Sequence, residues 1–238
     1  MDNAIYAALT RQSGLMNEMR AVANNIANAN TNGFRREGVI FSEHLSALDR
    51  RGDTLSMANA RGRMVDLSQS SLSQTGGTFD IAIEGEGFFM VQTPEGNRLT
   101  RAGAYMLSPE GELMNAEGNR LLDEGQAPIA IPPGTGRIAI GADGTIAADG
   151  QPIAQVGVFA EPPGQDLTHA GGTLFIAAGD VEPLENPSIR QGFLEESNVN
   201  PIAEITRMIE VQRAYELGQS FLDREDQRIR AVLTAMRN

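Results

Sequence analysis

The hydrophobic positions near the C-terminus, in residues 198–238, repeat at alternating steps of four and three. The pattern begins after Asn200 and Pro201, residue types that suit the cap and the first position of a helix. Such a 3.5-residue repeat predicts a helix that lies along other helices. At about 1.5 Å per residue, a helix from Pro201 to Met236 is roughly 54 Å long, so it needs packing partners. The repeat runs through Ile205, Met208, Gln212, Tyr215, Gln219, Leu222, Asp226, Ile229, Leu233 and Met236.

The N-terminal segment, residues 2–29, carries the same spacing. Its repeat runs through Ile5, Leu9, Gln12, Met16, Met19, Ala23 and Ile26. Frequent alanines favour a helix, and Gly14 is its one weak point. Two interpretations are open: two amphipathic helices packed on a globular domain, or a coiled coil of the two ends with each other or with neighbouring chains. The length of the C-terminal helix favours the coiled coil.

Asparagines crowd the end of the N-terminal helix. Five of the nine residues from Asn24 to Asn32 are Asn, a residue whose amide competes with the helix for backbone hydrogen bonds. This pattern predicts a fraying helix end, closed by Asn32-Gly33 in a left-handed turn. The alternative is that the amides of Asn24, Asn25 and Asn28 bond across a subunit interface.

The remaining chain divides into two parts. Residues 35–75 are polar and weakly periodic, with arginines whose most common environment would be solvent, and they predict an extended linker. In residues 76–197, short apolar runs alternate with turns such as Pro94-Glu95-Gly96-Asn97, which predicts an antiparallel β domain. The predicted fold class is α+β: helices at 1–34 and 198–238 form one coiled-coil-like unit, into which the β domain is inserted.

Composition narrows the possible functions. The net charge of −12 disfavours binding to nucleic acid or to anionic lipid. With 0 Cys, disulfides and thiolate metal sites are excluded. Residues 1–10 lack the pattern of a cleavable signal peptide, and no apolar run is long enough to predict insertion into a membrane.

Candidate catalytic chemistry is sparse. The histidines, His44 and His169, are far apart in the sequence, so no metal pair is predicted. The run Gly85-Glu86-Gly87 lacks the third glycine of a dinucleotide fingerprint. A pair of catalytic carboxylates stays open among the many acidic residues. We therefore predict no catalytic residue, no metal ligand and no cofactor.

Four segments together resemble one family. They are Ala23-Asn24-Asn25-Ile26-Ala27-Asn28 with Thr31-Asn32-Gly33-Phe34-Arg35, Asp80–Phe89, Thr100–Tyr105, and Glu196–Pro201 with Met208–Glu216. In this order they resemble the signatures of bacterial flagellar rod and hook proteins. The modest length and the opening Met1–Tyr6 are most like the proximal rod member, with the distal rod member as the alternative.

The resemblance implies a structural subunit of the flagellar rod, the hollow shaft that transmits torque to the hook. It implies export from the cytoplasm without a cleaved signal, through the flagellar type III apparatus, to a periplasmic rod. The implied partners are other rod proteins and copies of the same chain. The alternatives are a hydrolase that cleaves peptidoglycan and a cytoplasmic coiled-coil scaffold.

We expect the assembly interface to use one face of each terminal helix. On the N-terminal side its residues are Ile5, Leu9, Met16, Met19, Asn24, Asn25, Ile26 and Asn28. On the C-terminal side they are Ile205, Met208, Gln212, Tyr215, Leu222, Ile229 and Leu233.

Overall fold

The C-terminal helix forms as predicted, as α2 (Pro201–Ala235). The Asn200 side chain accepts hydrogen bonds from the N–H groups of Ile202 (3.1 Å) and Ala203 (3.2 Å), which confirms the cap. The computed structural model describes residues 2–47, 54–161 and 167–236, and this description does not extend to the side chains of residues 2–7, 40–47 and 54–63. Over its 35 residues α2 is about 52 Å long.

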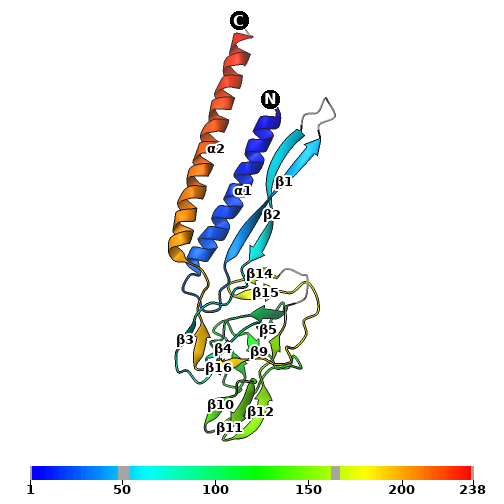
Figure 1. Ribbon diagram of the computed structural model, residues 1–238, viewed down its shortest axis with the longest axis vertical. Helices are drawn as coiled ribbons and strands as arrows, with labels where there is room; N and C mark the ends of the chain where they lie inside the picture. The colour runs from blue at the N-terminus through cyan, green and yellow to red at the C-terminus, as the bar shows by residue number, and fades with distance from the viewer. Residues whose placement is uncertain (1, 48–53, 162–166, 237–238) are drawn as a thin grey trace. The chain divides into compact units, whose positions relative to one another are not determined.

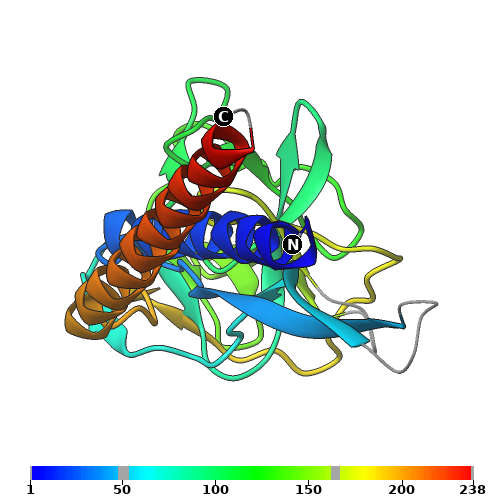
Figure 2. The ribbon, with the colours of Figure 1, turned by 90° about the horizontal axis from the view of Figure 1, so that it is seen from above.

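The N-terminal helix, α1 (Asp2–Ala27), lies beside α2 (Figures 1 and 2). The two helices are antiparallel, because Asn25 contacts Glu204 near the start of α2 and Gln12 contacts Tyr215 farther along. The end of α2 therefore runs past the start of α1, as Figure 1 shows. On its other side α1 contacts strand β1 (Glu37–Ala47).

The segment predicted as a linker is more regular than its sequence pattern indicated. β1 pairs with β2 (Thr54–Val65) as a two-stranded sheet. The sequence did not predict this pairing, because its apolar residues do not alternate as they do in a strand with one buried face. Backbone hydrogen bonds between strands do not require such alternation.

The predicted antiparallel β domain is present in residues 65–199. Its main sheet contains, in spatial order, β14 (Thr168–Gly171), β15 (Leu174–Ile176), β6 (Gly96–Thr100), β5 (Phe88–Thr93), β9 (Arg120–Leu121), β8 (Leu113–Met114) and β7 (Met106–Leu107), and β13 (Val158–Phe159) also pairs with β5. The successive β7–β8 and β8–β9 pairs are antiparallel, so residues 106–121 form consecutive hairpins.

Smaller sheets complete this domain. They are β10 (Ile138–Ile140) with β11 (Thr145–Ala148) and β12 (Gln151–Gln155), β16 (Ile189–Gln191) with β4 (Ile81–Ile83), and β17 (Phe193–Glu195) with β3 (Leu72–Gln74). One hydrophobic cluster is built around Phe89, Leu121 and Val156, and a second around Phe88, Leu99 and Phe175. Alternate residues of β5 thus face different clusters, as the two-residue period of a strand requires.

The described chain forms two compact units. The helical unit comprises Met1–Ala27, Glu37–Met64 and Asn200–Asn238, and the β unit comprises Asn28–Arg36 and Val65–Val199. The chain therefore passes between the units at four places along the sequence.

Asn198 ties together three of these passages on the β-unit side. Its Oδ1 accepts a hydrogen bond from Arg36 N (2.7 Å). Its Nδ2 donates to Asp66 O (2.9 Å) and Ser68 O (3.1 Å). One amide side chain therefore holds three chain segments that are distant in sequence.

Candidate assembly interface

Asn25 fastens three elements of the helical unit. Its Nδ2 donates to Glu37 O (2.8 Å) and to Glu204 Oε2 (3.1 Å), and its Oδ1 accepts from Glu37 N (2.9 Å). The side chain is fully buried, where an unpaired amide would be costly. These bonds fix the end of α1 against the starts of α2 and β1.

Gln12 and Gly218 set the register of the two helices farther along. Gln12 Nε2 donates to Tyr215 O (3.1 Å). A Cβ at position 218 would lie 2.7 Å from that nitrogen, so glycine leaves the room that the Gln12 amide uses. Gly218, the one glycine of α2, is thus part of a helix contact.

A charged pair joins the helices between these two contacts. Arg207 Nε donates to Glu18 Oε1 (2.6 Å), and its Nη1 lies 3.1 Å from Glu210 Oε2. Beside this pair a groove of about 400 Å³ opens between the helices. Leu15, Val211 and Ala214 are among the side chains that line it.

The predicted interface residues fall into three groups. Asn25 is buried; Met16, Met19, Asn24, Ile26, Asn28, Met208, Tyr215, Leu222 and Ile229 are half-buried; Leu9, Ile205, Gln212 and Leu233 are exposed. Ile5 lies in α1, but its side chain is outside the described part of the chain. The side of α2 toward α1 runs through Glu204, Met208, Val211, Tyr215, Gly218 and Leu222, all buried or half-buried.

α2 carries a second apolar side whose large side chains are exposed. Ile202, Ile205 and Ile209 follow one another by three and four, which places them on one face. They are 78%, 49% and 46% exposed. Leu217 and Phe221 are also exposed farther along α2. The 3.5-residue repeat does not include Ile202 and Ile209, although they form a second helical stripe with Ile205.

Beyond the paired part of the helices, the end of α2 exposes more apolar surface. Val232, Leu233 and Met236 are 52%, 61% and 81% exposed. Monomeric proteins seldom leave large apolar side chains gathered on one element. The exposed side and end of α2 therefore have the character of a protein interface.

The β unit contains a buried ionic cluster. Glu195 Oε1 lies 2.7 Å from Arg35 Nη1, and Glu195 Oε2 lies 3.3 Å from Arg101 Nη1. Arg101 Nη2 also donates to Gly85 O (2.8 Å). Burial lowers the pKa of Arg101 to about 10, against the opposing effect of the Glu195 carboxylate. The arginines of residues 35–75 were predicted to lie in solvent. For Arg35 this prediction is wrong, because its side chain is fully buried.

The segment that carries Arg35 is held by other contacts of the β unit. Gly33 has φ +73°, and a Cβ there would lie 2.3 Å from Ala102 N, so the left-handed turn predicted at Asn32-Gly33 is required. His169 packs between Phe34 and Phe175, with ring-centroid distances of 5.5 and 4.4 Å. His44 has its side chain outside the described residues.

Two features of the described residues bear on metal binding and membrane insertion. They contain no group of three or more His, Cys, Asp or Glu side chains placed to hold a metal ion. Among the described helices, none combines the length and the apolar character needed to cross a membrane.

Comparisons with known proteins match almost the whole chain. Residues 5–35 match the model "Flagella basal body rod protein", residues 82–148 the "Flagellar hook protein FlgE/F/G D1 domain", and residues 190–235 the "Flagellar basal body rod FlgEFG protein C-terminal". The flagellar basal-body rod protein FlgF of Mesorhizobium japonicum is 39% identical over 91% of this chain and 90% of its own.

Further relatives carry the same or a related name. FlgF of Caulobacter vibrioides is 36% identical over 94% of this chain and 93% of its own. FlgG of Buchnera aphidicola, also a basal-body rod protein, is 33% identical over 90% of this chain and 92% of its own. With this identity over nearly full length, the chain belongs to the family of flagellar basal-body rod proteins.

Proposed function

We propose that this chain is a structural subunit of the bacterial flagellar rod, of the FlgF type. The observation that carries the proposal is the uncovered apolar side of α2, around Ile202, Ile205 and Ile209. Family membership supports the role, and the FlgF relatives at 39% and 36% identity, against 33% for the FlgG relative, favour the proximal over the distal rod. Because the family is structural, the hydrolase and scaffold alternatives are set aside.

The finer proposal concerns how subunits join. The terminal helices pack as a coiled-coil-like unit with helices of neighbouring copies and of other rod proteins. The exposed residues Leu9, Ile205, Gln212 and Leu233 contact neighbours directly, and the half-buried ones border those contacts. Asn25 acts indirectly, by holding α1 and α2 in register. Repeated contacts of this kind need not close on themselves and can build a shaft.

Export and location belong to the same proposal. The subunit passes through the flagellar type III apparatus and assembles in the periplasm, where the rod transmits torque to the hook. The sparse burial along α2 supports this route, because a helix with few buried contacts is readily unfolded for passage.

The test compares two single substitutions on α2. Ile205→Glu places a carboxylate on the uncovered apolar side, and Ala203→Glu places one on another exposed part of the same helix turn. We expect both purified chains to keep the helix content and unfolding midpoint of the parent. In cells, we expect Ile205→Glu to be exported but to leave rods incomplete and swimming lost, while Ala203→Glu supports swimming. Equal motility of the two variants would contradict the proposed interface.

A further inference from the structure

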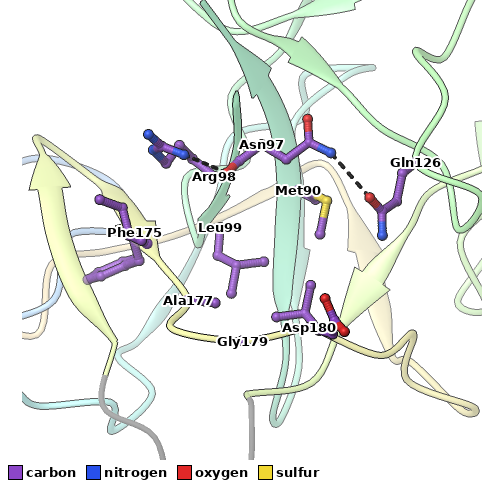
Figure 3. A pocket seen from close by; sticks show the side chains of 11 residues that line it. Met90, Asn97, Arg98, Leu99, Gln126, Phe175, Ala177, Gly179 and Asp180 are labelled. Atoms are coloured by element: carbon purple, nitrogen blue, oxygen red, sulfur yellow. Dashed lines mark hydrogen bonds between the residues drawn. The ribbon is translucent and has the colours of Figure 1, made fainter. Parts of the chain in front are cut away.

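A cavity of about 320 Å³ opens in the β unit, beside β5, β6 and β15 (Figure 3). The accessible apolar part of its lining is formed by Ile176, Ala177 and Val181. Beneath them lie the buried side chains of Met90, Leu99 and Phe175, which belong to the second hydrophobic cluster. Asn97 and Gln126 line one side of it, and Asp180 lies at another edge. The cavity thus combines an apolar interior with a polar margin, as binding sites do.

The backbone of Gln126 is unusual for a residue at the margin of a cavity. Its φ is +62°, a left-handed conformation that glycine adopts more readily. It closes a turn in which Gln126 N donates to Asp123 O (3.0 Å). Asp149 also has positive φ, but an Asp-Gly hairpin turn accounts for it. Asp123 N also donates to Ala127 O (2.9 Å), so Gln126 is the last residue of a three-residue hairpin loop, a position that is left-handed and usually glycine. The glutamine side chain, rather than the backbone conformation, is therefore the feature to explain.

That side chain is held toward the cavity by a second amide. Asn97 Nδ2 donates to Gln126 Oε1 (3.2 Å), and Figure 3 shows the two side chains meeting at the margin. This bond leaves the Gln126 NH₂ group as a donor and Asn97 Oδ1 as an acceptor. A donor beside an acceptor complements the C=O and N–H groups of an extended peptide. The apolar interior would then take one of that peptide's side chains.

The opposite end of the same sheet supplies such a peptide. β7 is the last strand in the spatial order, whereas β15 lies near the other end. In β7, Met106 and Leu107 are 53% and 41% exposed. Within the described β unit, Ile176 at the cavity is the one other exposed large hydrophobic residue. The exposed large hydrophobic residues of the described β unit therefore lie toward the two ends of one sheet.

We propose that the cavity binds β7 of a second copy of this chain, with Met106 or Leu107 entering it and the Asn97–Gln126 pair bonding its backbone. One copy contributes its cavity and the other its β7. After two copies have joined, the pair still has an unoccupied cavity on one copy and an unbound β7 on the other. Such a head-to-tail contact continues from copy to copy. The inference rests on the proposed rod function, to which it adds a contact between β units.

Disulfide trapping tests the contact directly, since the natural chain has 0 Cys. Basal bodies are purified from cells whose sole copy carries Leu107→Cys and Ile176→Cys, and mild oxidation is followed by immunoblotting for this chain. We expect disulfide-linked dimers and longer multimers from the double variant. Neither single variant should yield dimers. Dimers from Leu107→Cys alone would indicate a symmetric contact and overturn the proposal.

A mismatched pair controls for random encounters. Leu107→Cys with Ala139→Cys uses an exposed residue of β10 that does not line the cavity, and we expect its dimer yield to be at least tenfold lower. Adding Gln126→Gly to the matched pair relieves the left-handed strain but removes one amide. We expect severalfold fewer dimers with no loss of stability.

The outcomes separate this contact from the rod function. If basal bodies contain the chain but the matched pair gives no dimers, or no more than the mismatched pair, the β7 contact is wrong and the rod role stands. An unchanged dimer yield with Gln126→Gly would also overturn the contact. If the parent chain is missing from basal bodies, both proposals fail.

Discussion

At the scale of single residues, buried polar groups fix the β unit. Glu195 serves two guanidinium groups at once, and its Oε1 also accepts a hydrogen bond from Ser70 N (2.9 Å). Arg35 and Arg101 therefore depend on one carboxylate for their neutralisation. Removing one partner of a buried ion pair leaves an uncompensated charge, which costs far more than the pair itself contributes.

Glu195→Gln should therefore destabilise the β unit strongly. The change keeps the shape of the side chain but leaves two buried cations without an anion. We expect the free energy of unfolding to fall by about 3–5 kcal/mol, measured by urea titration. Glu196→Gln, one residue later and exposed, should change it little. Similar losses in the two variants would contradict the importance of the cluster.

Tyr105 gives the β unit an alkaline pH dependence. Its ring packs edge-on against Phe89 at 6.0 Å, and its hydroxyl donates to Ala102 O (3.0 Å). Burial raises the pKa of this hydroxyl above its ordinary value. Above a pH of about 10, tyrosine ionises in the unfolded chain while Tyr105 stays protonated in the folded one. The stability linked to Tyr105 is thus complete below that pH and declines above it.

Tyr105→Phe should reveal this dependence. At pH 8 the variant loses one hydrogen bond, so we expect it to unfold about 1 kcal/mol more easily. As the pH rises beyond about 10, the parent loses stability that the variant cannot lose, and the gap should close. Urea titrations from pH 8 to pH 11 measure the gap. A gap that stays constant would contradict the assigned shift.

Local chemistry made some residues predictable and others not. Asn200, Pro201 and Gly33 act through their own backbone neighbourhood, so the sequence was sufficient to predict them. Arg35 acts through Glu195, which is distant in the sequence, and arginine usually lies in solvent. No short-range signal could reveal that pair.

At the scale of elements, α2 was predicted in extent but only partly in orientation. The repeat correctly included Met208, Tyr215 and Leu222 on the side toward α1. At the other positions the repeat predicted Ile205, Gln212 and Gln219, but these are exposed. The side toward α1 has instead the residue before each of them: Glu204, Val211 and Gly218. A polar Glu or a Gly is not recognised as a contact from the apolar pattern, since each depends on a specific partner on α1.

A double-mutant cycle on Gln12 and Gly218 tests that contact. In an exposed helix, Gly→Ala typically adds about 1 kcal/mol of stability. Here the new Cβ should displace the Gln12 amide from Tyr215 O, and the lost bond should offset the gain. We therefore expect Gly218→Ala to leave stability nearly unchanged in the parent chain and to raise it in the Gln12→Ala variant. Thermal unfolding, followed by the helical circular-dichroism signal, measures both effects.

The control for this cycle is a neighbouring exposed position. Gln219→Ala lies one residue along α2, outside the side toward α1. Its effect on stability should be the same in the parent chain and in the Gln12→Ala variant. If Gly218→Ala also has the same effect on stability in the parent chain and in the Gln12→Ala variant, the Gln12 amide and Gly218 do not interact energetically.

At the scale of the whole molecule, the two units differ in how much they bury. The β unit has two hydrophobic clusters, whereas α2 buries only Glu204 and Val211 fully among its described residues. Isolated stability depends mainly on burial of apolar surface. The helical unit is therefore expected to be the less stable part of the free subunit.

Hydrogen exchange of the free subunit should show this difference. We expect amides of α2, above all from Asp226 to its end, to exchange much faster than those of β4 and β5. In urea, the helical circular-dichroism signal should be lost before the β unit unfolds. Protection of the end of α2 should rise on incorporation into rods. A single transition with equal protection throughout would contradict the expectation.

The hydrogen bonds of Asn198 have a mechanical consequence. In the proposed rod, forces enter a subunit through one part and leave it through another. Here the covalent path between the units is fourfold, and Asn198 clamps Arg36, Asp66 and its own segment together. Strain applied to any one of these segments is shared among the three. Within the β unit, a load on one of these segments therefore reaches the other two through the hydrogen bonds of one side chain.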